Sequence, residues 1–243
     1  MKISNKDIIG EVVAKDYRTA SVFKKAGIDF CCRGNRSIET VVEDENKMES
    51  LVAELNEVLD LKSQDQIDFQ AWPLDLLADY IEKTHHRYVE SKIQEIKPFL
   101  NKVAKVHGKN HPELMDIEME FLTSAGELSM HMKKEELVLF PFIRKMVANE
   151  KQPDSIEEPH FGSVQNPVEM MKEEHDAEGE RFRRIAKLSN DYTPPADACN
   201  TFRVTYSMLQ EFEENLHQHI HLENNILFPK ALKLEEKLFN QKS

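Results

Sequence analysis

An eleven-residue pattern that occurs twice constrains this chain more than any other feature. Residues 131–141 read HMKKEELVLFP and residues 219–229 read HIHLENNILFP, so both copies follow His-x-x-x-Glu-x-x-x-Leu-Phe-Pro. A separation of four residues places the histidine and the glutamate on one face of a helix, one turn apart. The repeat therefore predicts two helices that each carry a pair of metal-capable side chains on one face.

Apolar residues continue the face that carries each pair. Met208, Phe212 and Leu216 lead into the second copy at helical spacing, and Leu128 precedes the first copy in the same way. We therefore expect both pairs to face a helical core rather than water. Because burying an unpaired charge costs several kcal/mol, a metal ion is the usual compensation for such a pair.

Two further histidines extend the repeat. His86 lies 45 residues before His131, and His175 lies 44 residues before His219. Antiparallel helices joined over a nearly constant gap would bring these side chains to one level, which predicts a dinuclear metal site with two histidines for each metal and two bridging glutamates. Mixed imidazole and carboxylate ligands suit iron or manganese best. The predicted ligands are His86, His131, Glu135, His175, His219 and Glu223.

The ligand from the first long helix has two candidates, because His85 and His86 are adjacent. The apolar neighbours Leu77, Ile81 and Val89 lie closer to the face of His85, whereas the length of the gap favours His86. We predict that His86 is the ligand and His85 the alternative.

Three other polar side chains near the repeat need an assignment. His217 and His221 lie about 100° away from the face of His219, which predicts that they are surface histidines. Glu127 precedes His131 by one helical turn. It is either a carboxylate that supports the ligand or a solvated side chain.

Helical spacing of apolar residues extends over almost the whole chain, and only 7 of 243 residues are glycine. We predict an all-α fold with long helices over residues 73–105, 112–149, 167–190 and 196–239, and with Pro98 kinking or ending the first. Short connections indicate an up-down-up-down four-helix bundle in residues 69–243. Residues 1–68 are predicted to form a small helical module with helices over about 5–26 and 37–61.

The module contains an adjacent cysteine pair in the loop IDFCCRGN, residues 28–35. Adjacent cysteines do not easily form an unstrained disulfide with each other. Cys31 and Cys32 are therefore either reactive thiols beside Arg33, ligands that bind or transfer a soft metal, a link to another chain, or small packing residues. Cys199 is predicted to be structural.

The charge balance excludes several classes of partner. The formal net charge is −12, which disfavours nucleic acid and anionic lipid surfaces.

The sequence contains no apolar run long enough to span a bilayer and no secretory signal at residues 1–13. Three cysteines are too few for a disulfide scaffold, so we expect a reducing cytoplasm.

Together these motifs resemble a known family. The double His-x-x-x-Glu pattern is similar to hemerythrin-like domains, and its combination with an N-terminal Asp-Phe-Cys-Cys module resembles the repair of iron centres (RIC) family of iron-sulfur cluster repair di-iron proteins. The other stretches that carry the resemblance are THHRY at 84–88, EEHDAEGE at 173–180 and TPPADAC at 193–199.

The resemblance implies two non-haem iron ions per chain, bridged by oxo or hydroxo groups and by carboxylates, with the same six ligands. It implies repair of iron-sulfur clusters damaged by nitric oxide or oxidative stress, by iron donation or by nitric oxide reduction. Implied partners are damaged iron-sulfur proteins, nitric oxide or dioxygen, and a second copy in a homodimer. The sequence departs from the family in one place, since Arg33 follows the cysteines where glycine is usual. It also departs from oxygen-carrying hemerythrins, which typically have a fifth histidine and an aspartate bridge, because a second His-Glu pair takes their place.

Two other functions can be compared with the sequence, and only the first fits it. A hemerythrin-like module that binds or senses oxygen or nitric oxide without repairing clusters would need the same ligands. A zinc hydrolase would need a His-Glu-x-x-His or nucleophile motif, and the sequence contains neither.

Overall fold

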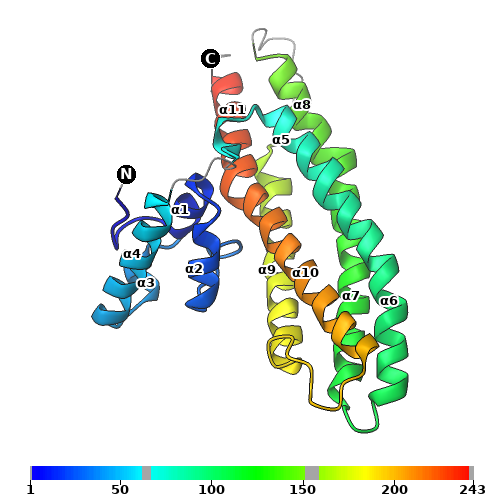
Figure 1. The fold of residues 1–243 in the computed structure, drawn as a ribbon. Helices are drawn as coiled ribbons and strands as arrows, with labels where there is room; N and C mark the ends of the chain where they lie inside the picture. The colour runs from blue at the N-terminus through cyan, green and yellow to red at the C-terminus, as the bar shows by residue number, and fades with distance from the viewer. Residues whose placement is uncertain (1, 62–66, 151–158, 241–243) are drawn as a thin grey trace.

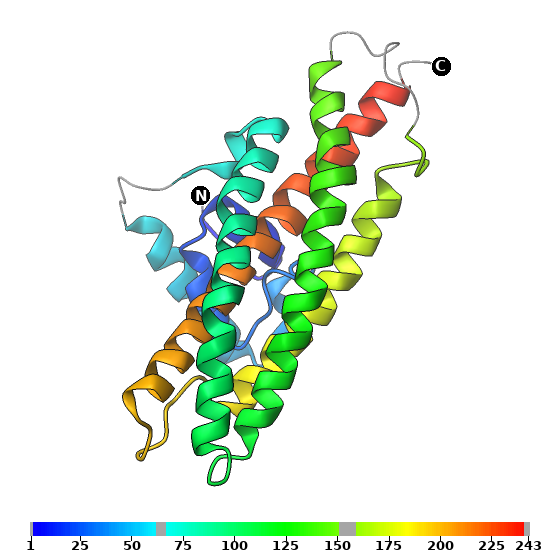
Figure 2. The ribbon, with the colours of Figure 1, turned by 90° about the vertical axis from the view of Figure 1, so that its right-hand side faces the viewer.

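Four long antiparallel helical rods form the bundle in the computed structural model, which describes residues 2–61, 67–150 and 159–240 (Figures 1 and 2). The rods are α5, η2 and α6 (Leu74–Tyr80, Ile81–His86, Arg87–His107), α7, η3 and α8 (Glu113–Lys134, Glu135–Leu139, Phe140–Ala148), α9 (Gln165–Leu188), and α10, η5 and α11 (Asn200–Leu222, Glu223–Leu227, Phe228–Asn240). No strand occurs within these described ranges. The predicted all-α, up-down-up-down bundle is confirmed.

Three of the four rods contain a π-helical turn. These turns are η2, η3 and η5, and each interrupts an otherwise α-helical rod at mid-length. Wide π-turns of this kind are rare and are often found at functional sites. Pro98, in contrast, lies inside α6, which continues to His107. The helix therefore does not end early, because the apolar residues on both sides of the proline, including Ile96 and Leu100, are buried in the bundle.

The N-terminal module consists of α1 (Ile9–Lys15), α2 (Thr19–Lys25), α3 (Ile38–Val41) and α4 (Glu45–Asp60), followed by the short 3-10 turn η1 (Phe69–Ala71). It packs beside α10 and η5, as Figure 1 shows. The prediction of two continuous helices over 5–26 and 37–61 is wrong, since each is divided into two. The boundary near residue 68 remains a prediction.

Local hydrogen bonds of two aspartates explain the divisions. Asp16 is extended at the end of α1, and its carboxylate accepts a hydrogen bond from the backbone N–H of Arg18 at 3.0 Å. The carboxylate of Asp44 caps α4 through the backbone N–H of Lys47, also at 3.0 Å. Aspartate competes with the helix for backbone donors, so it favours a cap or a turn over a helix interior.

Two clusters of buried apolar residues lie on either side of the middle of the bundle. One joins the module to α6, α7, α9 and α10 and includes Phe23, Phe182 and Phe212. The other joins α5, α8 and α11 and includes Phe140 and Phe228. Each fully buried side chain of this size stabilises the fold by about 1.5–3 kcal/mol. No helix among the described residues is both long enough and apolar enough to cross a membrane.

Candidate metal centre

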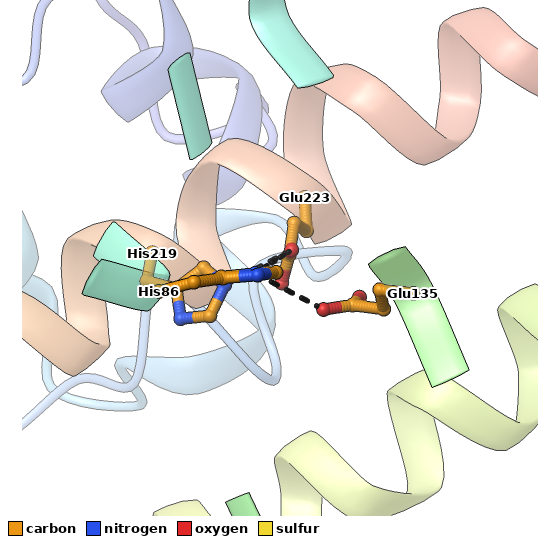
Figure 3. Close-up of side chains that lie close together, drawn as sticks. All are labelled: His86, Glu135, His219 and Glu223. Atoms are coloured by element: carbon orange, nitrogen blue, oxygen red, sulfur yellow. Dashed lines mark hydrogen bonds and ion pairs between the residues drawn. The ribbon is translucent and has the colours of Figure 1, made fainter. Parts of the chain in front are cut away.

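Six buried side chains from the four rods meet at mid-length of the bundle. His86, Glu135, His219 and Glu223 form one group (Figure 3). The other is formed by His131, Glu135, His175 and Glu223. Within each group the potential ligand atoms lie within 4.8 Å of one another. Because both glutamates belong to both groups, the arrangement can hold two adjacent cations with the carboxylates between them. The structure thus brings together all six predicted ligands.

The Nε2 atoms of the four histidines converge on the carboxylates. His86 Nε2 lies 3.3 Å from Glu135 Oε2 and 4.0 Å from Glu223 Oε1. His131 Nε2 lies 3.4 Å from Glu135 Oε2, His219 Nε2 lies 3.0 Å from Glu223 Oε1, and His175 Nε2 lies 3.1 Å from Glu223 Oε2. Two of these ring nitrogens, from His131 and His175, are only 3.1 Å apart. This convergence of lone-pair donors is what a metal site requires.

The buried polar atoms of this cluster fit a cation. Glu135 and Glu223 are fully buried. Both carboxylate oxygens of Glu135, Oε2 of Glu223 and Nε2 of His86 have no hydrogen-bond partner among the described residues. A buried polar atom without a partner costs about 1–3 kcal/mol, and more when it is charged. A bound cation would remove this cost, and the donor set of imidazole and carboxylate suits iron.

The pKa values of the histidines also show that the site attracts positive charge. Burial lowers the pKa of His86, but the nearby carboxylates of Glu135 and Glu223 outweigh burial and raise the pKa to about 10. In the same way, burial lowers the pKa of His175 and the nearby carboxylate of Glu223 raises it to about 9. The two carboxylates therefore attract either protons on the imidazoles or metal ions in their place.

Three side chains that the sequence did not single out hold the histidine rings. Glu136 lies 3.0 Å from His86 Nδ1, Glu174 lies 2.8 Å from His131 Nδ1, and Asn224 lies 2.9 Å from His175 Nδ1. An acceptor on Nδ1–H leaves the lone pair of Nε2 for a metal. Each of the three is the chain neighbour of a predicted ligand, and that adjacency was the only signal in the sequence.

The alternative ligand His85 is buried but belongs to neither group. Its ring stacks on His219 with centroids 5.6 Å apart, and its Nδ1 lies 3.2 Å from Asn215 Oδ1. Burial lowers the pKa of His85 to about 4. Both adjacent histidines are inside the bundle because they share the wide turn η2. The geometry places His86, not His85, with the other ligands.

The prediction that His217 and His221 are surface histidines is wrong, because the N-terminal module covers their face. His221 is 1% exposed and contacts the rings of Tyr17 and Phe30, at centroid distances of 5.6 and 6.1 Å. Burial lowers its pKa to about 3. His217 is half-buried against Phe30. Periodicity within one helix could not show what another domain would cover.

Glu127 does not support a ligand. Its side chain is 49% exposed and forms an ion pair with Arg181 at 2.6 Å. It does, however, line a pocket of about 120 Å³ whose wall also includes His131 and His175. This pocket opens the bundle surface toward one of the two groups of ligands, and it is large enough for a few small molecules.

The Leu-Phe-Pro ending of each repeat accounts for the wide turns. Glu135 begins η3 and Glu223 begins η5, and Pro141 and Pro229 follow these turns by two residues. Proline has no N–H to donate to the preceding turn, so the α-helical bonding pattern is interrupted there. The wide turn begins at the glutamate that enters the core in each repeat.

The cysteine pair lies against the backbone of a ligand. The Sγ atoms of Cys31 and Cys32 are 3.7 Å apart, and Cys32 Sγ lies 3.4 Å from the carbonyl oxygen of His175. Cys31 is buried and Cys32 is partly exposed. Cys199, by contrast, is exposed at the start of α10, where its Sγ lies 3.2 Å from His107 Nε2.

An antiparallel four-helix bundle with inward histidines and glutamates at mid-length is the architecture of a hemerythrin-like protein. Residues 77–231 match the hemerythrin HHE cation-binding domain, and residues 5–59 match the N-terminal domain of ScdA, described as a domain of unknown function. The first match covers more than half of the chain.

Curated relatives share both parts. The chain is 33% identical over 231 residues to the iron-sulfur cluster repair protein ScdA of Staphylococcus haemolyticus, which covers 94% of this chain and 99% of that protein. It is 32% identical over 222 residues to the iron-sulfur cluster repair protein YtfE of Yersinia pestis, covering 90% of this chain and 93% of that protein. The chain belongs to the repair of iron centres family, the ScdA and YtfE type of iron-sulfur cluster repair protein.

Proposed function

We propose that this protein repairs damaged iron-sulfur clusters and that its six buried ligands hold two non-haem iron ions. The observation that carries the proposal is that Glu135 and Glu223 each belong to both groups of ligands. The names of the relatives and the cation-binding domain support the same function.

The six residues would bind the two ions in two sets. His86 and His219 would hold one ion, His131 and His175 the other, and the two glutamates would lie between them. When bound, the iron pair supplies redox chemistry and a binding site for a diatomic molecule such as nitric oxide or dioxygen. The pocket of about 120 Å³ beside His131 and His175 supports access of molecules of that size.

Release of iron would depend on the same carboxylates. Both bridging glutamates start π-turns, which are bonded differently from the α-helices around them and are therefore local points of adjustment. An ion that leaves the site must exchange with protons, because the histidines and glutamates bind metal only when deprotonated. We propose damaged iron-sulfur proteins of the cytoplasm as the recipients.

A metal count with Mössbauer spectroscopy on the purified protein tests the centre. We expect two iron ions per chain in one coupled pair. Glu135→Gln and Glu223→Gln remove a bridging charge, so both variants should lose iron, whereas Glu173→Gln, on the exposed face of α9, should keep it. A coupled iron pair that persists in both bridging variants, or zinc in place of iron, contradicts the proposal.

An iron-transfer assay distinguishes a repair protein from a sensor. The iron-loaded protein is mixed with an apo-ferredoxin, a thiol and a sulfide source, and formation of the ferredoxin cluster is followed by its visible absorption. Cluster formation supports repair by iron donation. If the iron stays bound under these conditions while nitric oxide still binds to it, the protein is a hemerythrin-like sensor instead.

A further inference from the structure

The loop between α2 and α3 gathers three metal-capable side chains outside the dinuclear centre. Potential ligand atoms of Asp29, Cys31 and Cys32 lie within 4.8 Å of one another. We propose that these three residues form a second, mononuclear site for a thiophilic divalent cation. None of the six ligands of the bundle contributes a sulfur atom, so this site would have its own metal preference.

The distances between the potential ligand atoms match those around a tetrahedral metal ion. With metal–sulfur bonds of about 2.3 Å and metal–oxygen bonds of about 2.1 Å, a tetrahedral angle separates two sulfurs by about 3.8 Å and a sulfur from an oxygen by about 3.6 Å. The two Sγ atoms are 3.7 Å apart, and Cys31 Sγ is 3.5 Å from Asp29 Oδ1. The loop would therefore need little rearrangement to bind.

Hydrogen bonds hold the carboxylate of Asp29 in this position. Its Oδ1 accepts from the backbone N–H groups of Cys31 and Cys32 at 3.2 and 2.9 Å, and its Oδ2 pairs with Arg183 at 2.9 Å. The loop itself is anchored on the bundle, because Asn224 donates to the carbonyl oxygen of Cys31. Ligands fixed in this way lose little conformational freedom on binding.

The charges of the site favour a cation. The carboxylate of Asp29, whose Oδ1 lies 3.5 Å from Cys31 Sγ, places a negative charge beside the cysteine pair. A divalent cation would take the place of the two thiol protons, so binding would release one proton from each cysteine and leave two metal-bound thiolates. The two charges of the ion then compensate the two thiolates, while Arg183 compensates the carboxylate.

A pocket leads to these residues from the surface. It has a volume of about 440 Å³ between the module and the bundle, and Asp29, Cys31, Arg183 and Tyr192 are among the residues that line it. The hydroxyl of Tyr192 is buried and has no hydrogen-bond partner among the described residues, so the pocket has an unused polar group in its wall. The pocket is therefore a route by which an ion with its water molecules can reach Asp29 and Cys31.

The site lies directly behind a ligand of the dinuclear centre, because Cys32 Sγ contacts the carbonyl oxygen of His175. If the proposed function holds, an iron ion on its way out of the bundle could be held here next. The second site itself does not depend on that function and is tested separately.

Cobalt is the probe, because only sulfur ligands give thiolate-to-cobalt charge-transfer absorption in the near ultraviolet. Metal-free full-length protein is titrated with Co²⁺ under reducing conditions. We expect the intensity of this absorption at saturation to correspond to one thiolate-bound cobalt per chain, because cobalt in the dinuclear centre has no sulfur ligand and does not contribute to the band. It should be lost in Cys31→Ser and in Cys32→Ser and retained in Cys199→Ser, the matched control. Asp29→Asn should weaken binding by about tenfold or more.

Three results would overturn the site: no charge-transfer band in the unaltered protein, a band that survives replacement of both Cys31 and Cys32, or a band that disappears with Cys199→Ser. Circular dichroism shows whether each variant is folded, and Cys31→Ala and Cys32→Ala replace any serine variant that is not. Iron content of the same variants is measured in parallel. Loss of the cobalt band with the iron pair intact supports the second site alone, whereas an intact band without iron contradicts only the dinuclear centre.

Discussion

Asn224 sets the ring orientation of His175. The amide nitrogen of Asn224 donates to the carbonyl oxygen of Cys31 at 3.2 Å, and its oxygen lies 2.9 Å from His175 Nδ1. A carbonyl oxygen can only accept, so the amide must present its oxygen to the histidine. His175 therefore carries its proton on Nδ1 when it is neutral and offers Nε2 to the metal. One side chain thus connects the cysteine loop to a predicted ligand.

Two substitutions separate the contact of Asn224 with His175 from its contact with Cys31. Asn224→Asp keeps an acceptor for His175 and loses the donor to Cys31, whereas Asn224→Ala loses both. We expect Asn224→Asp to retain most of its metal affinity and Asn224→Ala to lose affinity by about 10–100-fold. Competition with a chelator measures this difference. Equal affinities in the two variants would contradict the role of the acceptor.

Glu136 and Glu174, which accept from the rings of other predicted ligands, should also affect metal affinity. Glu136→Gln and Glu174→Gln keep an oxygen near His86 and His131 but remove the negative charge that makes each imidazole a stronger ligand. Metal affinity should fall by about tenfold in each variant. Chelator competition measures the affinity. Glu95→Gln is the control, because Glu95 is exposed on α6 and pairs with Lys92 rather than with a residue around the ligands. A similar fall in that variant would show that the effect is not specific.

The close approach of α1 to η5 requires a glycine. A Cβ atom at Gly10 would lie 2.3 Å from Asn225 Oδ1 and 3.1 Å from the carbonyl oxygen of Gly34. Gly10→Ala should therefore lower the free energy of unfolding by about 1–3 kcal/mol. Denaturant titration measures this value.

Gly126 provides the matched control, since a Cβ there meets no atom within 4 Å in the described structure. Gly126→Ala lies inside α7 and should raise stability by about 0.5–1 kcal/mol. Stabilisation by both substitutions would contradict the tight contact of the module with the bundle.

A histidine at the far end of the bundle predicts a pH dependence of stability. His111 Nε2 lies 3.1 Å from Asp197 Oδ1, which joins the α6–α7 connection to the start of α10. The bond to Asp197 raises the pKa of His111, and the same bond lowers the pKa of Asp197. Because the folded pKa of His111 is raised, its stabilisation is fully present below the ordinary histidine pKa and disappears as pH rises through the folded value.

The stability difference between the unaltered protein and His111→Gln should therefore be larger at about pH 5.5 than at about pH 9. Thermal unfolding at both pH values measures it. His160→Gln, in a different connection, is the control. A difference that does not change with pH would show that His111 contributes by packing alone, through its contact with Phe202.

Some features of the fold and of the site could be predicted from the sequence, and others could not. The bundle and the convergence of six ligands followed from two copies of one pattern and a nearly constant gap, because helical periodicity and antiparallel packing are local and repetitive properties. Periodicity did not decide between His85 and His86, and only the length of the gap favoured His86, since η2 brings both into the core and periodicity assumes a regular α-helix. The breaks at Asp16 and Asp44 were missed because the apolar pattern continues across them.

The sequence by itself determined the helical fold and which histidines and glutamates come together in the core, because spacing along a helix decides which side chains share a face. Only the tertiary structure decided the burial of His221, the acceptors on the ligand rings and the position of Cys32 against His175. These contacts join residues far apart in the chain, and their geometry depends on how the module packs against the bundle rather than on the order of residues within one helix.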